Sequence, residues 1–251
     1  MSELLEVRDV SFSYNESAVI LKDVSVTLRE GEIVCLLGVS GGGKTTLFNI
    51  IAGLVRPDKG SVLLRGEDIT GQSGKVSYML QKDMLLPYRT VEDNVALPLI
   101  IKGTKKKEAR RIVGGYFRQF GIDGRQKKYP AELSGGMRQR AALLRTYLFS
   151  ADVALLDEPF SALDAITKAD MHRWYLDVME NIRLSTIFIT HDIDEAIMLS
   201  DRIYLLGGRP GEIKDEIVIS EPKPRRADFN LTDDFLVYKR RIITQIQGNK
   251  I

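Results

Sequence analysis

The sequence predicts an α/β fold in which a mainly parallel sheet, flanked by helices, binds its ligand at the carboxyl ends of its strands. Two observations carry this prediction. A short apolar run, Ile33 to Leu37, leads into a glycine-rich loop and then into a segment with helical spacing. A wholly apolar run, Val153 to Leu156, ends in two adjacent carboxylates, Asp157 and Glu158. Short apolar runs are typical of strands that a parallel sheet buries on both faces.

The start of the chain predicts an antiparallel β subdomain ahead of this sheet. Apolar residues recur at strand spacing at Leu5, Val7, Val10 and Phe12, and again at Val24, Val26 and Leu28. Gly31 then turns the chain into the apolar run at 33–37.

The glycine-rich loop, Gly38 to Thr46, has the sequence Gly-Val-Ser-Gly-Gly-Gly-Lys-Thr-Thr and is called the phosphate loop below. Glycines let backbone N–H groups turn around an anion, and the following helix directs its positive end to the same place. Lys44 is placed to reach β and γ phosphates, and the Thr45 hydroxyl to bind Mg²⁺. The expected nucleotide contacts are Gly38, Ser40, Gly41, Gly42, Gly43, Lys44, Thr45 and Thr46. The alternative is a glycine-rich turn without a ligand.

The carboxylates that end the run at 153–156 are the second candidate site. Sheets of this class bind ligands at the carboxyl ends of their strands, beside the first strand-to-helix turn. Asp157 is suited to hold Mg²⁺ through its water shell, and Glu158 to orient and deprotonate an attacking water. If the sequence had no phosphate loop, the better interpretation would be that these two acidic residues only cap a loop.

The middle of the chain predicts a helical insert. Strands are expected at 61–64 and at 75–80, the second ending at Gln81. Helices are then expected at 90–101 and, after a lysine-rich turn, at 105–120. We therefore expect a single domain with a nucleotide-binding core at 1–81 and 133–220, a helical insert at 82–132, and a C-terminal tail with a short helix at 221–251.

Strand and helix alternation returns after the insert. Helices are expected at 163–181 and 193–199, and strands at 186–190 and 202–206. A turn, Gly207 to Gly211, precedes an edge strand. The last expected helix is amphipathic, at 232–246, with Phe235, Ile242 and Ile246 on one face.

Composition limits the classes of function. The 251 residues carry a formal net charge of +2, with 44% hydrophobic and 28% charged residues, which predicts no basic nucleic-acid face. Cys35, the only cysteine, is expected to pack in the core, and two distant histidines predict no structural zinc site. The N-terminus lacks the basic start of a secretory signal, and no apolar run approaches the ~20 residues that span a bilayer. A cytoplasmic protein that can dock on a membrane protein is expected.

A further candidate site opens the helix that is expected to run to about residue 149. Leu133 to Arg140 has the sequence Leu-Ser-Gly-Gly-Met-Arg-Gln-Arg. Ser134 is a good N-cap, and Gly135 and Gly136 leave backbone N–H groups of the first turn open to approach. Taken alone, this pattern favours an ordinary capped helix.

Together these residues resemble the nucleotide-binding subunit of the ATP-binding cassette (ABC) family over nearly the whole chain. The family's signature loop matches 133–136, and its Ser-Ala-Leu-Asp segment matches 161–164. Its remaining markers fall at Gln81, His191 and Tyr14. The resemblance implies a P-loop NTPase core, ATPase activity, and ATP with Mg²⁺.

The resemblance also implies roles for single residues. His191 would contact the γ-phosphate, Gln81 would contact Mg²⁺ and the attacking water, and Tyr14 would stack on adenine. Without the family pattern, Gln81 is an exposed strand end, His191 a surface or core histidine, and Tyr14 a strand aromatic.

The signature loop completes the implied nucleotide contacts with Ser134, Gly135, Gly136 and Asp164. Met137 departs from the family, which more often has glutamine there, and its side-chain role is left open.

A single phosphate loop at an open sheet edge leaves the γ-phosphate facing solvent, although hydrolysis needs excluded water and added positive charge. The resemblance implies that two cassettes, a homodimer or a pair, meet head to tail and bury ATP between Lys44 of one and Ser134 of the other. Closure would act on integral membrane permease subunits. The apolar loop Met84 to Tyr88 is the expected contact, with packing of the insert's core as the alternative. Lys105 to Lys107 is expected to be a solvated helix start rather than a lipid-binding patch.

The expected function is that of an ATPase subunit, peripheral on the cytoplasmic face of the membrane, in an importer fed by a periplasmic or extracellular solute-binding protein. Residues 85–97 and 207–211 resemble the importers of nitrate, sulfonate, taurine and related small organic compounds. The transported compound contacts other subunits and is not predicted. The alternatives are an exporter's ATPase subunit and a soluble cassette acting on nucleic acid or ribosomes. Relatives of the latter kind usually carry long coiled coils or two cassettes, which this sequence lacks.

Overall fold

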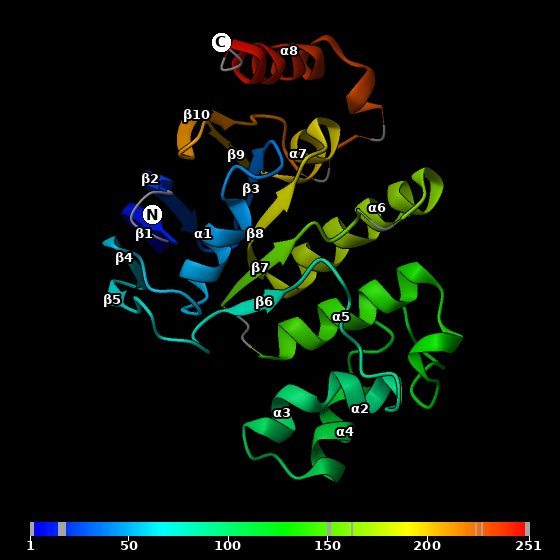
Figure 1. Ribbon diagram of the computed structural model, residues 1–251. Helices are drawn as coiled ribbons and strands as arrows, with labels where there is room; N and C mark the ends of the chain where they lie inside the picture. Colours follow the sequence, from blue (N-terminus) through cyan, green and yellow to red (C-terminus); the bar gives the residue numbers. More distant parts are fainter. Residues whose placement is uncertain are drawn as a thin grey trace.

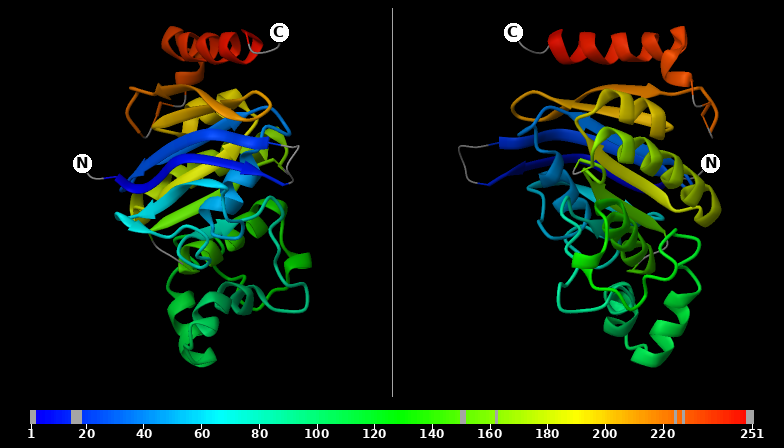
Figure 2. Two further views of the ribbon diagram at one scale, coloured as in Figure 1. Left: turned by 60° about the vertical axis from the view of Figure 1, so that its left-hand side comes forward. Right: turned by 90° about the vertical axis from the view of Figure 1, so that its right-hand side faces the viewer.

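The computed structural model describes residues 3–14, 19–149, 152–161, 163–223, 225–226 and 228–248. Within them, two sheets and their helices form a layered α/β body, with a cluster of helices at one end and a C-terminal helix at the other (Figures 1 and 2). None of the helices in this part of the chain is both long enough and apolar enough to cross a membrane.

The central sheet has the strand order β10, β9, β3, β8, β7, β6. Its parallel strands are β3 (Ile33–Gly38), β6 (Ser77–Met79), β7 (Val153–Asp157), β8 (Ser185–Thr190) and β9 (Arg202–Gly207). At one edge, β10 (Glu212–Val218) pairs antiparallel with β9. The mainly parallel sheet predicted from the sequence is confirmed, although β6 is shorter than the strand expected at 75–80.

A second, antiparallel sheet covers one side of the molecule (Figure 1). Its order is β2, β1, β4, β5. The strands are β1 (Glu3–Ser13), β2 (Val19–Arg29), β4 (Lys59–Leu64) and β5 (Glu67–Asp68). The predicted N-terminal antiparallel subdomain is therefore confirmed. Its sheet also contains β4 and β5, which follow the phosphate loop in the sequence.

Side chains of β3 alternate between two apolar cores, because successive residues of a strand point to opposite faces. Ile33, Cys35 and Leu37 pack in a core that contains residues of several helices, including α5 (Gly135–Phe149), α6 (Ala165–Ile182) and α7 (Ile193–Leu199). Cys35 is fully buried there, which raises the pKa of its thiol.

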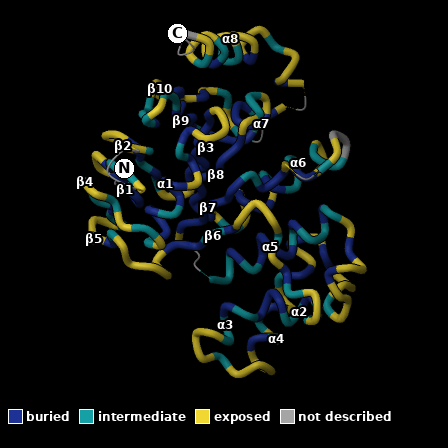
Figure 3. The backbone as a smooth tube through the Cα atoms, in the orientation of Figure 1, coloured by how far each residue is buried: buried dark blue, intermediate teal, exposed yellow. Residues whose placement is uncertain are grey.

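The other face of β3 fixes the helix that follows the phosphate loop. Val34 and Leu36 share a core with α1 (Lys44–Ile51) and with the antiparallel sheet. Figure 3 shows that the backbone of the central strands is formed mainly by buried residues. Because α1 is held between the two sheets, the position of its first turn is set by packing on both sides.

The helical insert is more fragmented than the sequence predicted. The helix expected at 90–101 is divided into α2 (Val91–Val95) and α3 (Leu97–Ile101), because Pro98 stands in the first turn of α3 and removes a backbone donor. The helix expected at 105–120 is α4 (Lys106–Gly114) followed by turns. Two consecutive glycines, Gly114 and Gly115, favour that early end. A short 3₁₀ turn, Pro130–Glu132, leads into α5.

The tail ends in α8 (Asp233–Gly248), which follows a 3₁₀ turn at Phe229–Leu231. Phe235 and Ile242 of α8 are buried, as the amphipathic pattern predicted, and Ile246 is partly buried against the same core. Arg225 donates to the carbonyls of Met198 and Ser200 at 2.8 and 2.6 Å, which closes the C-terminal end of α7. Burial lowers the pKa of Arg225 to about 10.

A buried ion pair ties the two sheets together at Arg202, the first residue of β9. Its side chain is 6% exposed, and it binds Glu32 through Nε to Oε1 at 2.6 Å and Nη2 to Oε2 at 2.9 Å. It also donates to the Thr27 carbonyl of β2 at 3.0 Å and to Glu216 Oε1 of β10 at 2.8 Å. Burial disfavours the charged guanidinium, but the hydrogen bonds that it donates to the Glu32 and Glu216 carboxylates outweigh this effect and raise the pKa of Arg202.

Arg202→Met is expected to lower the free energy of unfolding by about 3–5 kcal/mol, because it leaves the Glu32 carboxylate buried without its partner. Urea denaturation followed by circular dichroism measures the loss. The double variant Glu32→Gln, Arg202→Met should recover part of it, since no unpaired charge remains. The control is Arg111→Met, whose side chain is 76% exposed and whose ion pair should contribute less than about 1 kcal/mol. Equal losses for the two arginine variants would contradict the prediction.

Candidate active site

A cavity of about 330 Å³ at the carboxyl ends of β3 and β7 collects most of the residues singled out in the sequence. It lies between the phosphate loop and the end of β7. Its lining residues are Tyr14, Ile20, Ser40, Gly41, Gly43, Lys44, Thr45, Thr46, Asp157, Glu158 and Ile189. This edge is where parallel α/β sheets bind ligands.

Backbone geometry explains the glycines of the phosphate loop. Gly41 and Gly43 have φ values of 79° and 92°, in the left-handed region that residues with a Cβ rarely adopt. A Cβ at Gly43 would also lie 2.6 Å from Cδ2 of Leu21. The Leu47 amide donates to the Gly43 carbonyl at 2.9 Å, so α1 begins directly at the end of the loop and directs its free N–H groups at the cavity.

Lys44 lies folded back on the loop that precedes it. Its Nζ donates to the carbonyls of Gly38 and Val39 at 2.8 and 2.9 Å. Burial lowers the pKa of Lys44, and the carboxylates of Glu158 and Asp157 oppose this shift. The ammonium is therefore positioned by carbonyls and partly desolvated, which strengthens its attraction to an anion in the cavity.

Asp157 and Thr45 form the oxygen pair suited to a magnesium ion. The Thr45 hydroxyl donates to Asp157 Oδ2 at 3.2 Å across the cavity. Burial raises the pKa of Asp157, and the bond from Thr45 opposes the rise, so a cation here would stabilise the ionised carboxylate. No cluster of three or more His, Cys, Asp or Glu side chains suited to a metal occurs in the described ranges. A hydroxyl and one carboxylate fit Mg²⁺ that takes its other ligands from phosphates and water.

Three elements meet at the Glu158 carboxylate. Gln81, just after β6, donates Nε2 to Glu158 Oε2 at 2.9 Å. His191, just after β8, has Nδ1 3.2 Å from Oε1 of the same carboxylate. Glu158 itself has a φ of 45°, and its amide donates to the Ile189 carbonyl at 3.1 Å. The structure thus brings together the three residues proposed as catalytic, with both oxygens of Glu158 engaged by side chains.

Tyr14 stands at the mouth of the cavity. Its ring packs edge-on against Phe12 with centroids 4.9 Å apart, and its hydroxyl lies 3.4 Å from Thr46 Oγ1. The residue is 62% exposed. This placement is compatible with stacking on a base, which stays a prediction.

Ser134, Gly135, Gly136 and Asp164 do not line this cavity. Ser134 is exposed, and its Oγ accepts from the Met137 amide at 3.3 Å, as an N-cap of α5. Asp164 caps α6, accepting from the Thr167 amide at 3.0 Å and from its hydroxyl at 2.6 Å. Their roles toward a nucleotide stay predictions that require a second subunit.

The support of the phosphate loop from behind was not predicted from the sequence. A Cβ on Gly38 would overlap the Leu206 carbonyl, and a Cβ on Gly211 would overlap the Gly42 carbonyl. The Gly211 amide also donates to the Ile20 carbonyl at 2.8 Å, and Ile20 lines the cavity. The glycines of the turn at 207–211 are the signal in the sequence that could have indicated this contact.

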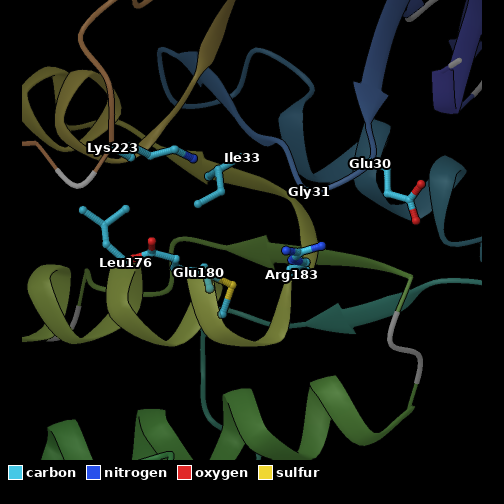
Figure 4. A pocket seen from close by; sticks show the side chains of 8 residues that line it. Glu30, Gly31, Ile33, Leu176, Glu180, Arg183 and Lys223 are labelled. Carbon is cyan, nitrogen blue, oxygen red and sulfur yellow. The ribbon is translucent and has the colours of Figure 1, made fainter. Parts of the chain in front are cut away.

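A larger cavity, about 380 Å³, lies at the opposite edge of the central sheet (Figure 4). It opens beside Ile33, the first residue of β3, between the turn at Glu30 and Gly31 and the C-terminal half of α6. It holds none of the residues expected to bind phosphate. The amino ends of parallel strands are also not the ligand-binding edge of such sheets, so the candidate site is the smaller cavity.

The strand, glycine loop and helix, with a lysine beside a carboxylate at a strand end, define a nucleotide-binding ATPase with a phosphate loop. More specifically, this chain belongs to the ABC transporter family, whose sequence model matches residues 21–161. The resemblance stated from the sequence is thereby confirmed.

Named relatives include import proteins. The formylaminopyrimidine import ATP-binding protein ThiZ of Halalkalibacterium halodurans is 45% identical over 210 residues, which cover 84% of this chain and 82% of that one. The nitrate import ATP-binding protein NrtD of Synechocystis sp. is 35% identical over 254 residues, covering 99% and 96%. Among solved structures, a dimeric post-hydrolysis state of the ATP-binding cassette MJ0796 bound to ADP and Pi has a TM-score of 0.72 at 27% identity. It covers 86% of this chain and 98% of that one.

Gly211→Ala is expected to weaken MgATP binding at least ~10-fold without unfolding the protein, because the added methyl must displace the Gly42 carbonyl and distort the phosphate loop. Fluorescent-nucleotide titration measures the affinity. Gly114→Ala is the matched control, since a Cβ there meets nothing within 4 Å, and it should leave the affinity unchanged. Unchanged binding in Gly211→Ala would show that the turn does not support the loop.

Proposed function

We infer that this chain is the ATP-hydrolysing subunit of an ABC importer, in which ATP-driven closure of two cassettes moves a separate permease. The single observation that carries the inference is the meeting of Gln81, Glu158 and His191 beside Lys44 at one sheet edge. The import names of ThiZ and NrtD favour an importer over the exporter and over a cassette acting on nucleic acid or ribosomes.

The geometry supports a separate role in hydrolysis for each group of residues at the site. Lys44 and the phosphate-loop amides would hold the β and γ phosphates. Glu158 would take a proton from the attacking water on one carboxylate oxygen, while Gln81 and His191 hold the water and the γ-phosphate in line. Thr45 and Asp157, with Gln81, would hold Mg²⁺, which supplies charge neutralisation for the transferring phosphate when bound.

A second cassette would complete the site. Ser134, Gly135 and Gly136 open α5 with an exposed cap, and Asp164 opens α6, so both helix starts are available to a nucleotide on another subunit. We propose that each ATP lies between Lys44 of one cassette and Ser134 of its partner. The dimeric MJ0796 cassette bound to ADP and Pi supports this arrangement by analogy.

We propose that the permease binds in an apolar groove of about 300 Å³. It lies between α1, α3 and α5, lined by Leu54, Pro98, Ile101 and Phe149 among others. Leu54 and Ile101 are 61% and 72% exposed, which is unusual for such large apolar side chains and is typical of an interaction surface.

The loop Met84 to Tyr88 was expected either to contact the permease or to pack in the core of the insert, and its residues differ in this respect. Leu85 is buried in the core, as the packing alternative required, whereas Met84 and Tyr88 are 56% and 72% exposed. We propose that these two side chains extend the groove contact with a short permease helix.

The cytoplasmic face of the membrane is the proposed location, because ATP and a permease must both be reached from there. A solute-binding protein on the other side would deliver the compound. The named substrates of the relatives, formylaminopyrimidine and nitrate, differ in chemistry, so we propose only a small solute related to these groups.

Glu158→Gln is expected to keep ATP binding, to lower turnover by about 10²–10⁴-fold, and to accumulate an ATP-bound dimer, because the amide cannot accept the proton of water. Phosphate release and size-exclusion chromatography with MgATP measure both effects. Lys44→Ala is the control that should lose nucleotide binding itself. Normal turnover in Glu158→Gln would remove Glu158 as the base.

Ser134→Phe is expected to leave nucleotide affinity within about twofold of wild type and to reduce hydrolysis by at least ~100-fold, since its bulk blocks the partner's nucleotide rather than its own. Introduced into Glu158→Gln, it should also prevent the ATP-dependent dimer. Ser134→Ala measures separately the loss of the helix cap, which contributes about 1 kcal/mol of stability. Full activity in Ser134→Phe would contradict the shared site.

A further inference from the structure

A second cavity, of about 270 Å³, adjoins the phosphate loop and is called the rear cavity below. Gly38, Val39 and Ser40 of the loop line it, and Ser40 also lines the nucleotide cavity, so the two spaces meet at the loop. The rear cavity opens at the carboxyl ends of β3 and β9, the edge where parallel α/β sheets bind ligands. Its position therefore favours a ligand site.

The C-terminal helix α8 forms the opposite wall of the rear cavity through Gln245 and Ile246. This helix lies over the hairpin of β9 and β10 (Figures 1 and 2). Arg241 of α8 donates to the carboxylate of Asp215 in β10 at 2.9 and 2.7 Å, and Ile242 is fully buried below the helix. The wall is therefore held in place by the fold, and the cavity is preformed.

The floor of the rear cavity is apolar. Leu37 of β3 and Leu205 and Leu206 of β9 line it, and all three are buried. Val39 lines it from the phosphate loop and is 48% exposed, and Ile246 is partly buried on the other side. A ligand with an apolar body would cover this surface, and the removal of apolar surface from water favours binding.

Both ionisable side chains that line the rear cavity are cations, Arg209 and Lys214. Arg209 is exposed and has no ion pair or hydrogen bond within the described ranges. Lys214 Nζ is 2.6 Å from Oε2 of Glu212, but Oε1 of the same carboxylate lies 3.7 Å from Nζ of Lys22. One carboxylate thus serves two ammonium groups, and the surroundings stay positive. This charge favours an anion.

Arg209 also acts on the nucleotide side of the loop. Its Nη2 is 3.5 Å from the position that a Cβ on Gly41 would take. Gly41 lines the nucleotide cavity and has no side chain to separate the guanidinium from it. The charge of Arg209 therefore adds to the positive potential that attracts phosphates. An anion that binds Arg209 from the rear cavity offsets that charge.

We propose that the rear cavity binds a small carboxylate with an apolar body, and that this ligand weakens the binding of MgATP. The apolar body packs on the leucines of the floor and on Ile246, and the carboxylate lies between Arg209 and Lys214. Because the bound charge offsets that of Arg209 beside Gly41, the ligand and MgATP oppose each other without sharing a site. The effect on MgATP rests on the proposed function, whereas binding of the carboxylate does not.

The first test uses benzoate as the probe and the full chain without nucleotide. Benzoate should bind saturably in saturation-transfer NMR and shift the methyl resonance of Ile246, which Ile246→Val identifies. Benzamide, which has the same shape without the charge, should bind at least ~5-fold more weakly, and so should benzoate to Arg209→Gln and to Lys214→Gln. Arg240→Gln, the same loss of charge at an exposed position of α8, should bind benzoate as wild type does.

Three results would overturn the site: no saturable binding of benzoate, equal binding of benzamide, or binding that is unchanged in both cation variants. Each would show that the two cations do not hold an anion in the rear cavity.

The second test measures MgATP affinity by fluorescent-nucleotide titration at constant ionic strength. Saturating benzoate should raise the Kd of MgATP about 3–10-fold in wild type. Arg209→Gln should show a similar rise without benzoate and no further rise with it, because the charge is already gone. Arg240→Gln should behave as wild type in both conditions.

An MgATP affinity that benzoate leaves unchanged or strengthens would overturn the inference. A Kd that keeps rising with benzoate concentration would also overturn it, because competition in the nucleotide cavity has no upper limit whereas coupling between two sites does. If the wild-type chain bound no MgATP at all, the proposed function would fail, and the benzoate shift at Ile246 would still report on the rear cavity.

Discussion

The close contact between the phosphate loop and the turn behind it is the constraint on which the site depends. Gly38, Gly42 and Gly211 bring two backbones together with no room for a Cβ on Gly38 or Gly211. On the other side, α1 is packed between the central and antiparallel sheets, with Phe48 and Ile50 fully buried. The loop is therefore preformed by the scaffold, so a nucleotide does not have to order it on binding.

Glu158, which we propose as the base, has a fixed backbone, whereas the side chains that contact its carboxylate come from different parts of the chain. The backbone amide of Glu158 donates a hydrogen bond to the Ile189 carbonyl, which fixes the main chain there. His191 precedes Asp192, which caps α7 and pairs with Lys168 of α6 at 2.7 Å. Gln81 belongs instead to the segment that leads into the insert. A site assembled from a fixed base and separately anchored partners can be switched by moving one partner, without disturbing the fold.

Local signals predicted most of the fold and half of the site. Spacing alone placed Lys44 beside Asp157, because strand ends of a parallel sheet share one edge. A shared site for Gln81, His191 and Glu158 was predicted only from the family resemblance, since nothing in the spacing of these residues brings them together. Arg202 with Glu32 and Gly211 with Gly42 were missed, because each contact joins residues far apart in sequence. The breaks in the insert helices could have been predicted from the sequence, since Pro98 and the Gly114-Gly115 pair are local signals for a helix end.

The burial of Cys35 in β3 makes the chain a convenient host for site-directed spectroscopy. Its thiol has no exposed surface and a raised pKa, so the reactive thiolate is scarce and sheltered from alkylating dyes and spin labels. A cysteine introduced at an exposed position would consequently react alone, with no need to remove the native one. Distances between two such probes, one on each side of the nucleotide, could be followed in an otherwise unaltered polypeptide.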